Sequence, residues 1–298
     1  MPAMTSPSPS SPSSSGDHRA RYVVILGTNE IASAVAVRLH QRGYGVVMSH
    51  DPLPPVIRRK MAFHDALFDD PVVLAGVTAQ RADNGVAVVA GLRQRGGVVI
   101  TDLGLLDLMV IRSLDVLIDA RLQKYQSTPD LRRLAQFTIG LGPGFTAGAN
   151  CDFAIETKPS KEGALVRRGA TEPADGVVRR LGERGAERFV YSASPGRWHS
   201  AMEIGSRVFK DYIVGYLAGD PVAAPFDGIL RGVVRDGMEV PAGVKLLEVD
   251  PRMRGAVWSG IEDRAQTIAR AVEGALALRD TPSVLRPSFR AVSPADDR

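Results

Sequence analysis

The segment that most constrains the fold is a strand, turn, helix and strand pattern near the start of the chain. Residues 22–26 (YVVIL) form an apolar run of strand length that ends at Gly27, and apolar residues at helical spacing follow over 30–43. A second apolar run, GVVMS, occupies residues 45–49. Strand, helix and strand within roughly 30 residues predict a βαβ unit, which requires a parallel sheet and a right-handed crossover.

The alternation continues along the first half of the chain. Helix-like stretches such as 85–95 separate further apolar runs of strand length. Those runs lie at 72–75, 98–101, 116–118 and 137–141. We therefore expect an α/β fold in which residues 21–160 form a Rossmann-like, doubly wound parallel sheet that binds a nucleotide or cofactor.

Residues 161–255 have a different texture, with short β-like pieces separated by Gly and Pro, and they contain an internal repeat. Gly205 leads to Val208 and an apolar run at 213, and Gly237 leads to Val240 and an apolar run at 245. Two such halves, each too small for its own core, resemble a biotinyl/lipoyl-like barrel-sandwich module. Carrier domains attach their cofactor to a lysine at the hairpin between the halves. Because residues 217–221 contain no lysine, we expect no covalent biotin or lipoate.

The two ends of the chain differ from the middle. Residues 1–20 are rich in Ser and Pro and predict a disordered tail, and residues 281–298 predict a flexible tail. Apolar spacing over 261–278 predicts a C-terminal helix within residues 256–280.

Composition excludes several classes of protein. The single cysteine rules out an internal disulfide and a cysteine metal cluster, and no Gly-Lys dipeptide or Gly-x-Ser-x-Gly motif is present. The net charge is +4 and the basic pairs are scattered, which argues against a nucleic-acid surface. No apolar run reaches the roughly 20 residues that span a bilayer, and the N-terminus lacks a secretory pattern. We expect a cytoplasmic protein without membrane contact, and an oligomer is left open.

The turn after the first strand is the first candidate site. Gly27 and Ala32 satisfy the outer positions of a dinucleotide fingerprint, Thr28 lies within it, and Asn29 replaces the middle glycine. The turn is either a nucleotide-phosphate site or a plain strand-to-helix turn. Asp51 follows the second strand at the place of a ribose contact, and its other interpretation is an Asp-Pro turn starter.

A glycine-rich loop after the run at 137–141 is the second candidate. Gly142 and Gly144 flank a proline and Thr146 follows, so free backbone amides in this loop could cradle an anion. The alternative is a rigid turn. Cys151 lies just beyond and is either a sulfur or selenium contact or a small buried hydrophobe.

Several stretches of the chain resemble proteins of the selenium-dependent molybdenum hydroxylase system. The two most specific are Ile139 to Gly148 (IGLGPGFTAG) and Ala224 to Gly232 (APFDGILRG). The pattern also includes stretches at 24–39, 57–67, 115–121, 156–157, 172–173, 250–252 and 263–265. Three positions depart from it: Asn29, residues 158–161 and residues 250–254. In its first half that family is similar to the accessory proteins that mature xanthine and carbon monoxide dehydrogenases.

The resemblance implies a maturation role. Such a protein holds molybdenum cofactor, as molybdopterin or its dinucleotide form, or assists its sulfur or selenium modification before insertion. Its partners would be a molybdenum hydroxylase apoenzyme and cofactor-biosynthesis proteins. Two alternatives stay open: an NAD(P)-dependent oxidoreductase, and a noncatalytic scaffold with a vestigial nucleotide site.

Overall fold

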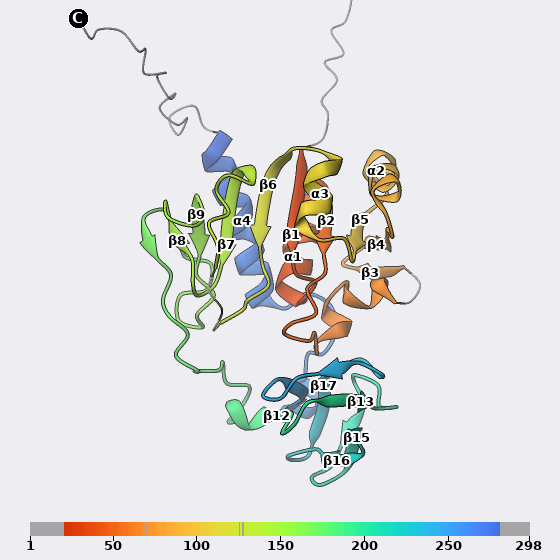
Figure 1. The fold of residues 1–298 in the computed structure, drawn as a ribbon. Coiled ribbons are helices and arrows are strands. Elements are labelled where there is room, and N and C mark those ends of the chain that lie inside the picture. Colours follow the sequence, from red (N-terminus) through yellow and green to blue (C-terminus); the bar gives the residue numbers. More distant parts are fainter. Residues whose placement is uncertain (1–20, 69–70, 125, 127, 281–298) are drawn as a thin grey trace, which may run out of the picture.

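The computed structural model describes residues 21–68, 71–124, 126 and 128–280. They form a large domain with one wide sheet and a small domain of antiparallel strands (Figure 1). The predicted tails at 1–20 and 281–298 lie outside the described residues.

The large sheet has the strand order β10-β9-β7-β6-β1-β2-β5-β4-β3. Every neighbouring pair from β9 to β4 is parallel, and the edge strands β10 and β3 are antiparallel. The strands are β1 Tyr22–Leu26, β2 Gly45–Ser49, β3 Val72–Leu74, β4 Val77–Arg81, β5 Val98–Thr101, β6 Leu114–Asp119, β7 Ala135–Leu141, β9 Phe153–Ile155 and β10 Leu165–Val166. The central strands are mostly apolar, since helices cover both faces of the sheet.

Helices α1 (Glu30–Gln41) and α4 (Asp263–Asp280) share one core with one face of the sheet. Helices α2 (Gly85–Gln94) and α3 (Leu105–Ile111) cover the other face, and each buries a single side chain fully, Val88 and Leu108. The strands β8 (Thr146–Ala147) and β11 (Gly169–Ala170) form a separate pair beside β9. The 3-10 turns η1 (Arg59–Met61) and η2 (His64–Leu67) follow β2.

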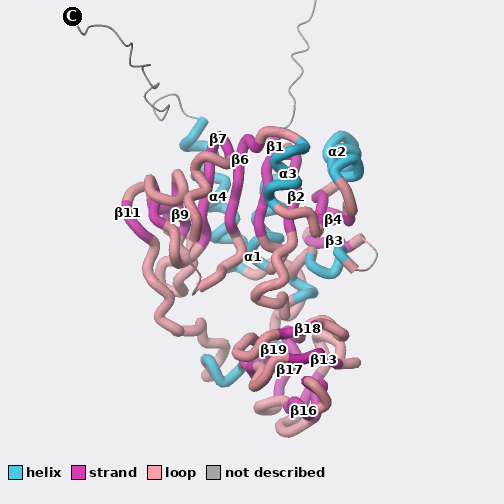
Figure 2. The backbone as a smooth tube through the Cα atoms, viewed as in Figure 1, coloured by secondary structure: helices cyan, strands magenta, loops and turns pink. Residues whose placement is uncertain are grey.

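The small domain consists of two four-stranded antiparallel sheets around Trp198 (Figure 2). One sheet has the order β12-β19-β17-β14 and the other β16-β15-β13-β18. Their bounds are β12 Phe189–Tyr191, β13 Gly196–His199, β14 Arg207–Val208, β15 Ile213–Leu217, β16 Asp220–Ala223, β17 Gly228–Val233, β18 Glu239–Val240 and β19 Lys245–Asp250, with 3-10 turns η3 Ala186–Arg188 and η4 Met253–Gly255. The two sheets interlock because the first repeat's β14 pairs with β17 of the second, and the second repeat's β18 pairs with β13 of the first.

The predicted fold class is wrong. The large sheet is mixed rather than all parallel, and β5 lies between β2 and β4, whereas the Rossmann order places consecutive strands side by side there. Among the residues that the structure describes, no helix lies between β6 and β7 or between β7 and β9. The small domain is a pair of antiparallel sheets for which the structure establishes no biotinyl/lipoyl module. The C-terminal helix is not a separate unit, since α4 packs on α1 in the large core.

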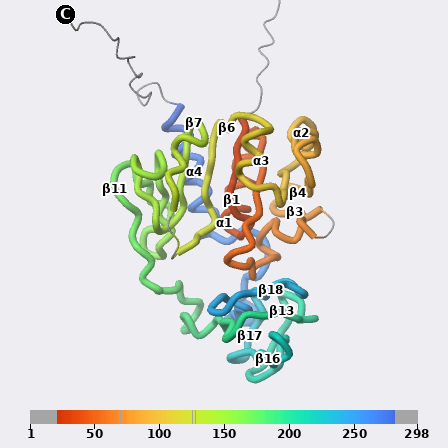
Figure 3. The backbone as a smooth tube through the Cα atoms, viewed as in Figure 1, coloured from red at the N-terminus to blue at the C-terminus, as the bar shows by residue number. Residues whose placement is uncertain are grey.

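Two segments carry the chain between the domains (Figure 3). Residues 171–185 lead down to the small domain, and residues 251–262 return to α4. The strands β10 and β11, inside the predicted 161–255 module, pair with strands of the large domain instead. A third contact is direct, because the backbone N–H of Val233 donates to the carbonyl of Ile57 at 2.9 Å. No helix of the described residues is long and apolar enough to cross a membrane.

Candidate functional site

The carboxyl ends of the central strands bring the predicted site residues to one edge of the large sheet. Gly27 follows β1, Asp51 follows β2 and Gly142 follows β7. At Gly27, φ is +102°, and a Cβ there would lie 3.1 Å from the carbonyl oxygen of Ala120. Only glycine fits this close approach of the β1 turn to the end of β6.

The side chain of Asn29 occupies the place where a phosphate would bind. Its Oδ1 accepts hydrogen bonds from the backbone N–H groups of Ile31 and Ala32, each at 3.0 Å, and its Nδ2 donates to the Ala120 carbonyl at 2.7 Å. Asn29 is therefore the N-cap of α1 and satisfies the amides that a pyrophosphate would need.

The space beside this turn is small. Gly27, Thr28, Asn29, Asp51 and Arg121 contribute to the lining of a cavity of about 10 Å³. That volume holds about one water, whereas ligand pockets measure roughly 300–1,000 Å³. Dinucleotide binding at Gly27, Thr28, Asn29 and Ala32 stays a prediction, and it requires the Asn29 side chain to leave its cap.

Asp51 is held by the loop that follows β6. Its carboxylate accepts hydrogen bonds from Gln123 Nε2 at 3.0 Å, from Arg121 at 3.3 Å and from the backbone N–H of Leu53 at 3.0 Å. Arg121 is also paired with Asp119 at 2.6 Å. Asp51 thus has the geometry of an Asp-Pro turn, and its ribose contact stays a prediction.

The Gly142 loop is also tied to its own chain. Gly142 N–H donates to the Ile155 carbonyl at 2.9 Å, and Thr146 N–H donates to Asn150 Oδ1 at 2.8 Å. Gly142 has φ +86°, and a Cβ there would lie 2.8 Å from Thr157 Oγ1. Gly144, with φ +91°, faces the hydroxyl of Thr128. The amides of Gly142 and Thr146 are thus already used, which favours the rigid-turn interpretation of this loop.

Cys151 lies just before β9 and belongs to the hydrophobic core on the face of the sheet that α2 and α3 cover. Its side chain has no solvent exposure, and burial raises the pKa of its thiol to about 12. A sulfur or selenium carrier needs an accessible thiolate. The structure therefore favours the interpretation of Cys151 as a small buried hydrophobe.

Two histidines, His50 and His64, lie near Thr28 at the same edge. Thr28 Oγ1 lies 2.9 Å from His64 Nδ1 and 3.4 Å from His50 Nδ1. Burial, followed by the charges of His50, Arg59 and Arg235, lowers the pKa of His64 to about 3. His64 is therefore neutral at physiological pH. Among the described residues, no group of three or more His, Cys, Asp or Glu is placed to hold a metal ion.

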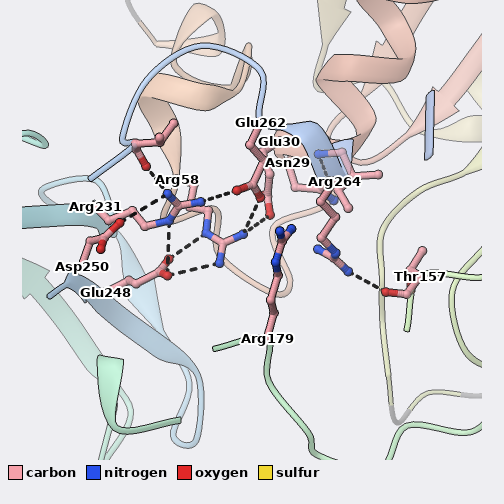
Figure 4. Close-up of polar contacts among 12 residues, drawn as sticks. Asn29, Glu30, Arg58, Thr157, Arg179, Arg231, Glu248, Asp250, Glu262 and Arg264 are labelled. Carbon is pink, nitrogen blue, oxygen red and sulfur yellow. Dashed lines mark hydrogen bonds and ion pairs between the residues drawn. The ribbon is translucent and has the colours of Figure 1, made fainter. Parts of the chain in front are cut away.

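A buried charge network that no sequence motif predicts joins the two domains at this edge (Figure 4). Arg58, from the segment after β2, pairs with Glu248 of β19 at 2.7 Å, with Glu30 of α1 at 2.8 Å and with Glu262 at 3.6 Å. Glu248 has no solvent exposure and also pairs with Arg188 and Arg231. One detectable signal was a glutamate at the centre of the apolar strand KLLEVD.

Two carboxylates of this network, Glu248 and Glu30, have a lowered pKa and stay ionised. Burial opposes the ionisation of Glu248, but Arg58, Arg231 and Arg188 outweigh it and lower the pKa of Glu248 below its ordinary value. The pKa of Glu30 is lowered in the same way, since Arg58 and Arg264 outweigh its burial. The junction is thus held by charges on both domains, and Arg58 is shared between them.

No family model matches the chain. The chain is 33% identical over 260 residues to the uncharacterized protein YqeB of Escherichia coli (strain K12), a match that covers 87% of this chain. It spans about half (48%) of that relative's length.

A search of solved structures gave an aspartoacylase family protein from Mesorhizobium loti. It is 12% identical, and the match covers 77% of this chain and 85% of that chain. Its TM-score of 0.24 is too low to indicate a shared fold. This match lends no support to a Rossmann or biotinyl/lipoyl fold.

Proposed function

We propose that the protein is an accessory factor in the maturation of molybdenum hydroxylases. In this role it holds molybdenum cofactor as cargo and passes it, or its sulfur- or selenium-modified form, to the apoenzyme. The residue pattern shared with the selenium-dependent molybdenum hydroxylase system supports the pathway.

The observation that carries the proposal is the contrast between the two parts of the sheet edge. The Gly27 turn is closed by its own Asn29, while cationic side chains gather where the small domain meets the edge. Molybdopterin carries a phosphate, and its dinucleotide form carries a pyrophosphate. A cationic junction between two domains suits the holding of such an anion better than the closed turn does.

The capped turn also bears on the alternatives. An NAD(P)-dependent oxidoreductase would need the amides of Ile31 and Ala32 for the pyrophosphate, and Asn29 occupies both. The same cap favours the second candidate function, a noncatalytic scaffold that binds the hydroxylase without any cofactor.

A transfer assay tests the proposal. The full chain is purified from a host that makes molybdenum cofactor and, in parallel, from a host that does not, and each preparation is mixed with a hydroxylase apoenzyme. We expect only the first preparation to restore hydroxylase activity. Equal failure of both preparations, with stable binding to the apoenzyme, would favour the scaffold.

A further inference from the structure

Three basic residues come from three segments of the chain that lead to the junction of the two domains. Lys124 belongs to the loop after β6, Arg179 to the connection between the domains, and Lys245 opens β19. Figure 4 shows the Arg179 side chain rising from that connection into the space between Arg58 and Arg264. The large domain, the connection and the small domain each contribute one cation.

The carboxylates near these cations are already paired with other residues. Glu30 and Glu248 are bound by Arg58, and Glu262 lies 2.6 Å from Arg231. Glu162 pairs with Arg264 at 3.1 Å, and its distance to Arg179 is longer, at 4.0 Å. Among the described residues, neither Lys124 nor Lys245 forms an ion pair with a carboxylate. Positive charge therefore exceeds negative charge at this point.

An aromatic ring and an arginine connect Lys245 with Arg179. The Nζ of Lys245 lies 3.7 Å from the centroid of the Phe189 ring, and the guanidinium of Arg188 lies 4.8 Å from the same centroid. Arg188 then donates a hydrogen bond to the backbone carbonyl of Arg179 at 2.7 Å. Because Arg188 is itself buried and paired with Glu248, it fixes the backbone from which Arg179 extends.

Burial and neighbouring cations lower the pKa of both lysines. Burial, Arg58 and Lys124 lower the pKa of Lys245 to about 8, and Glu248 and Glu30 only partly oppose them. Burial and Arg264 lower the pKa of Lys124, while Asp175 opposes them. An anion placed among these side chains would relieve the repulsion.

We infer that Lys124, Arg179 and Lys245 form a binding site for a phosphate or pyrophosphate group at the junction of the two domains. The inference deepens the proposed function and rests on it for the natural ligand, the phosphate-bearing end of a pterin cofactor. Lysine ammonium groups act as point charges on phosphate oxygens, and a guanidinium binds two of them at once. An anion held by all three segments would also hold the two domains together.

Inorganic pyrophosphate is the probe for the test, titrated into the full chain by calorimetry. We expect binding that weakens with salt, and a loss of about tenfold in affinity for each of Lys124→Gln, Arg179→Gln and Lys245→Gln. The matched control is Lys210→Gln, an exposed lysine of the small domain that should bind like the unaltered protein. All four variants should keep the thermal midpoint of the parent chain.

A proton count separates this site from nonspecific attraction. At pH 8, Lys245 is about half protonated, and a bound anion raises its pKa, so binding should take up protons. Titrations in two buffers of different ionisation enthalpy measure that uptake, and Lys245→Gln should abolish it. Equal pyrophosphate affinity in the parent chain and in the three variants would overturn the inference.

The two proposals fail in different ways. Pyrophosphate binding with the expected variant effects, but no transfer of cofactor to an apoenzyme, leaves the site standing and refutes the maturation role. Cofactor transfer that is insensitive to all three substitutions supports the role and refutes the site.

Discussion

The substitution Glu248→Gln should destabilise the small domain more than any single surface change. The carboxylate of Glu248 is fully buried and serves Arg58 at 2.7 Å, Arg231 at 3.3 Å and Arg188. Removing one partner from a buried ion pair costs about 3–5 kcal/mol, because an uncompensated charge is left in the interior. Arg58 keeps its pair with Glu30 and Arg231 keeps its pair with Glu262, so only Arg188 loses its sole carboxylate partner. We therefore expect the free energy of unfolding to fall by about 3 kcal/mol.

The positions of the tryptophans allow this effect to be measured locally. The chain has two tryptophans, Trp198 in the core of the small domain and Trp258 packed against that core. Urea unfolding followed by tryptophan fluorescence therefore reports the small domain, and far-UV circular dichroism reports mainly the helices of the large domain. The control is Glu239→Gln, which breaks an exposed pair with Arg197 and should cost less than about 1 kcal/mol. A loss for Glu248→Gln no larger than the control's would refute the reasoning.

Three further predictions concern single positions. Cys151 should not react with a thiol reagent in the folded protein at pH 8 and should react fully in urea, since it is buried with a pKa raised to about 12; rapid labelling of the folded chain would contradict this. Gly274→Ala in α4 would meet no atom within 4 Å and should raise the free energy of unfolding by about 0.5–1 kcal/mol. Gly140→Ala would place a Cβ 2.0 Å from the Phe145 ring and should lower it by about 1–3 kcal/mol. Thermal melts in which both variants shift in the same direction would contradict this packing. Acid should weaken the junction, because the pKa of Glu248 is lowered in the folded protein. The stability that the Glu248 carboxylate contributes is fully present above its ordinary pKa of 4.5 and is lost as the pH falls further. Unfolding of Glu248→Gln, followed by tryptophan fluorescence, should lack this acid-dependent loss.

The local elements of the large domain could be predicted from the sequence because each is encoded by neighbouring residues. The apolar run at 22–26, the helical spacing after Gly27 and the run at 45–49 correspond to β1, α1 and β2. The helix expected over 261–278 is found at 263–280. These patterns reflect burial on one face or on both faces of an element, which is a local property of the chain.

The order of the strands could not be predicted in the same way. In the sequence β4 comes before β5, yet β5 rather than β4 is the strand that pairs with β2. Nothing in the local sequence of either strand specifies its neighbour. β5 is buried throughout, whereas β4 (VTAQR) ends in exposed Gln80 and Arg81 and has no apolar run that would predict a strand. The choice depends on crossovers and on the packing of α2 against β2 and β5, which are properties of the whole domain.

The candidate site shows the same limit. The sequence shows that Asn29 places a side chain where the dinucleotide fingerprint has a glycine. It does not show that this side chain also binds the carbonyl of Ala120 after β6, because that residue lies 91 positions along the chain. The pairing of Arg58 with Glu248 joins residues 190 positions apart. Arg58 lies within the stretch 57–67 of the family resemblance, but no local pattern reveals the partner of a buried charge.

Native mass spectrometry of the full chain, purified from a host that makes molybdenum cofactor, tests the central claim most directly. We predict a bound pterin mass on the parent chain and on Lys210→Gln, and its loss when Lys124, Arg179 and Lys245 are all changed to Gln. A parent chain that carries no pterin under these conditions, or that binds only NAD(P), would contradict the maturation role.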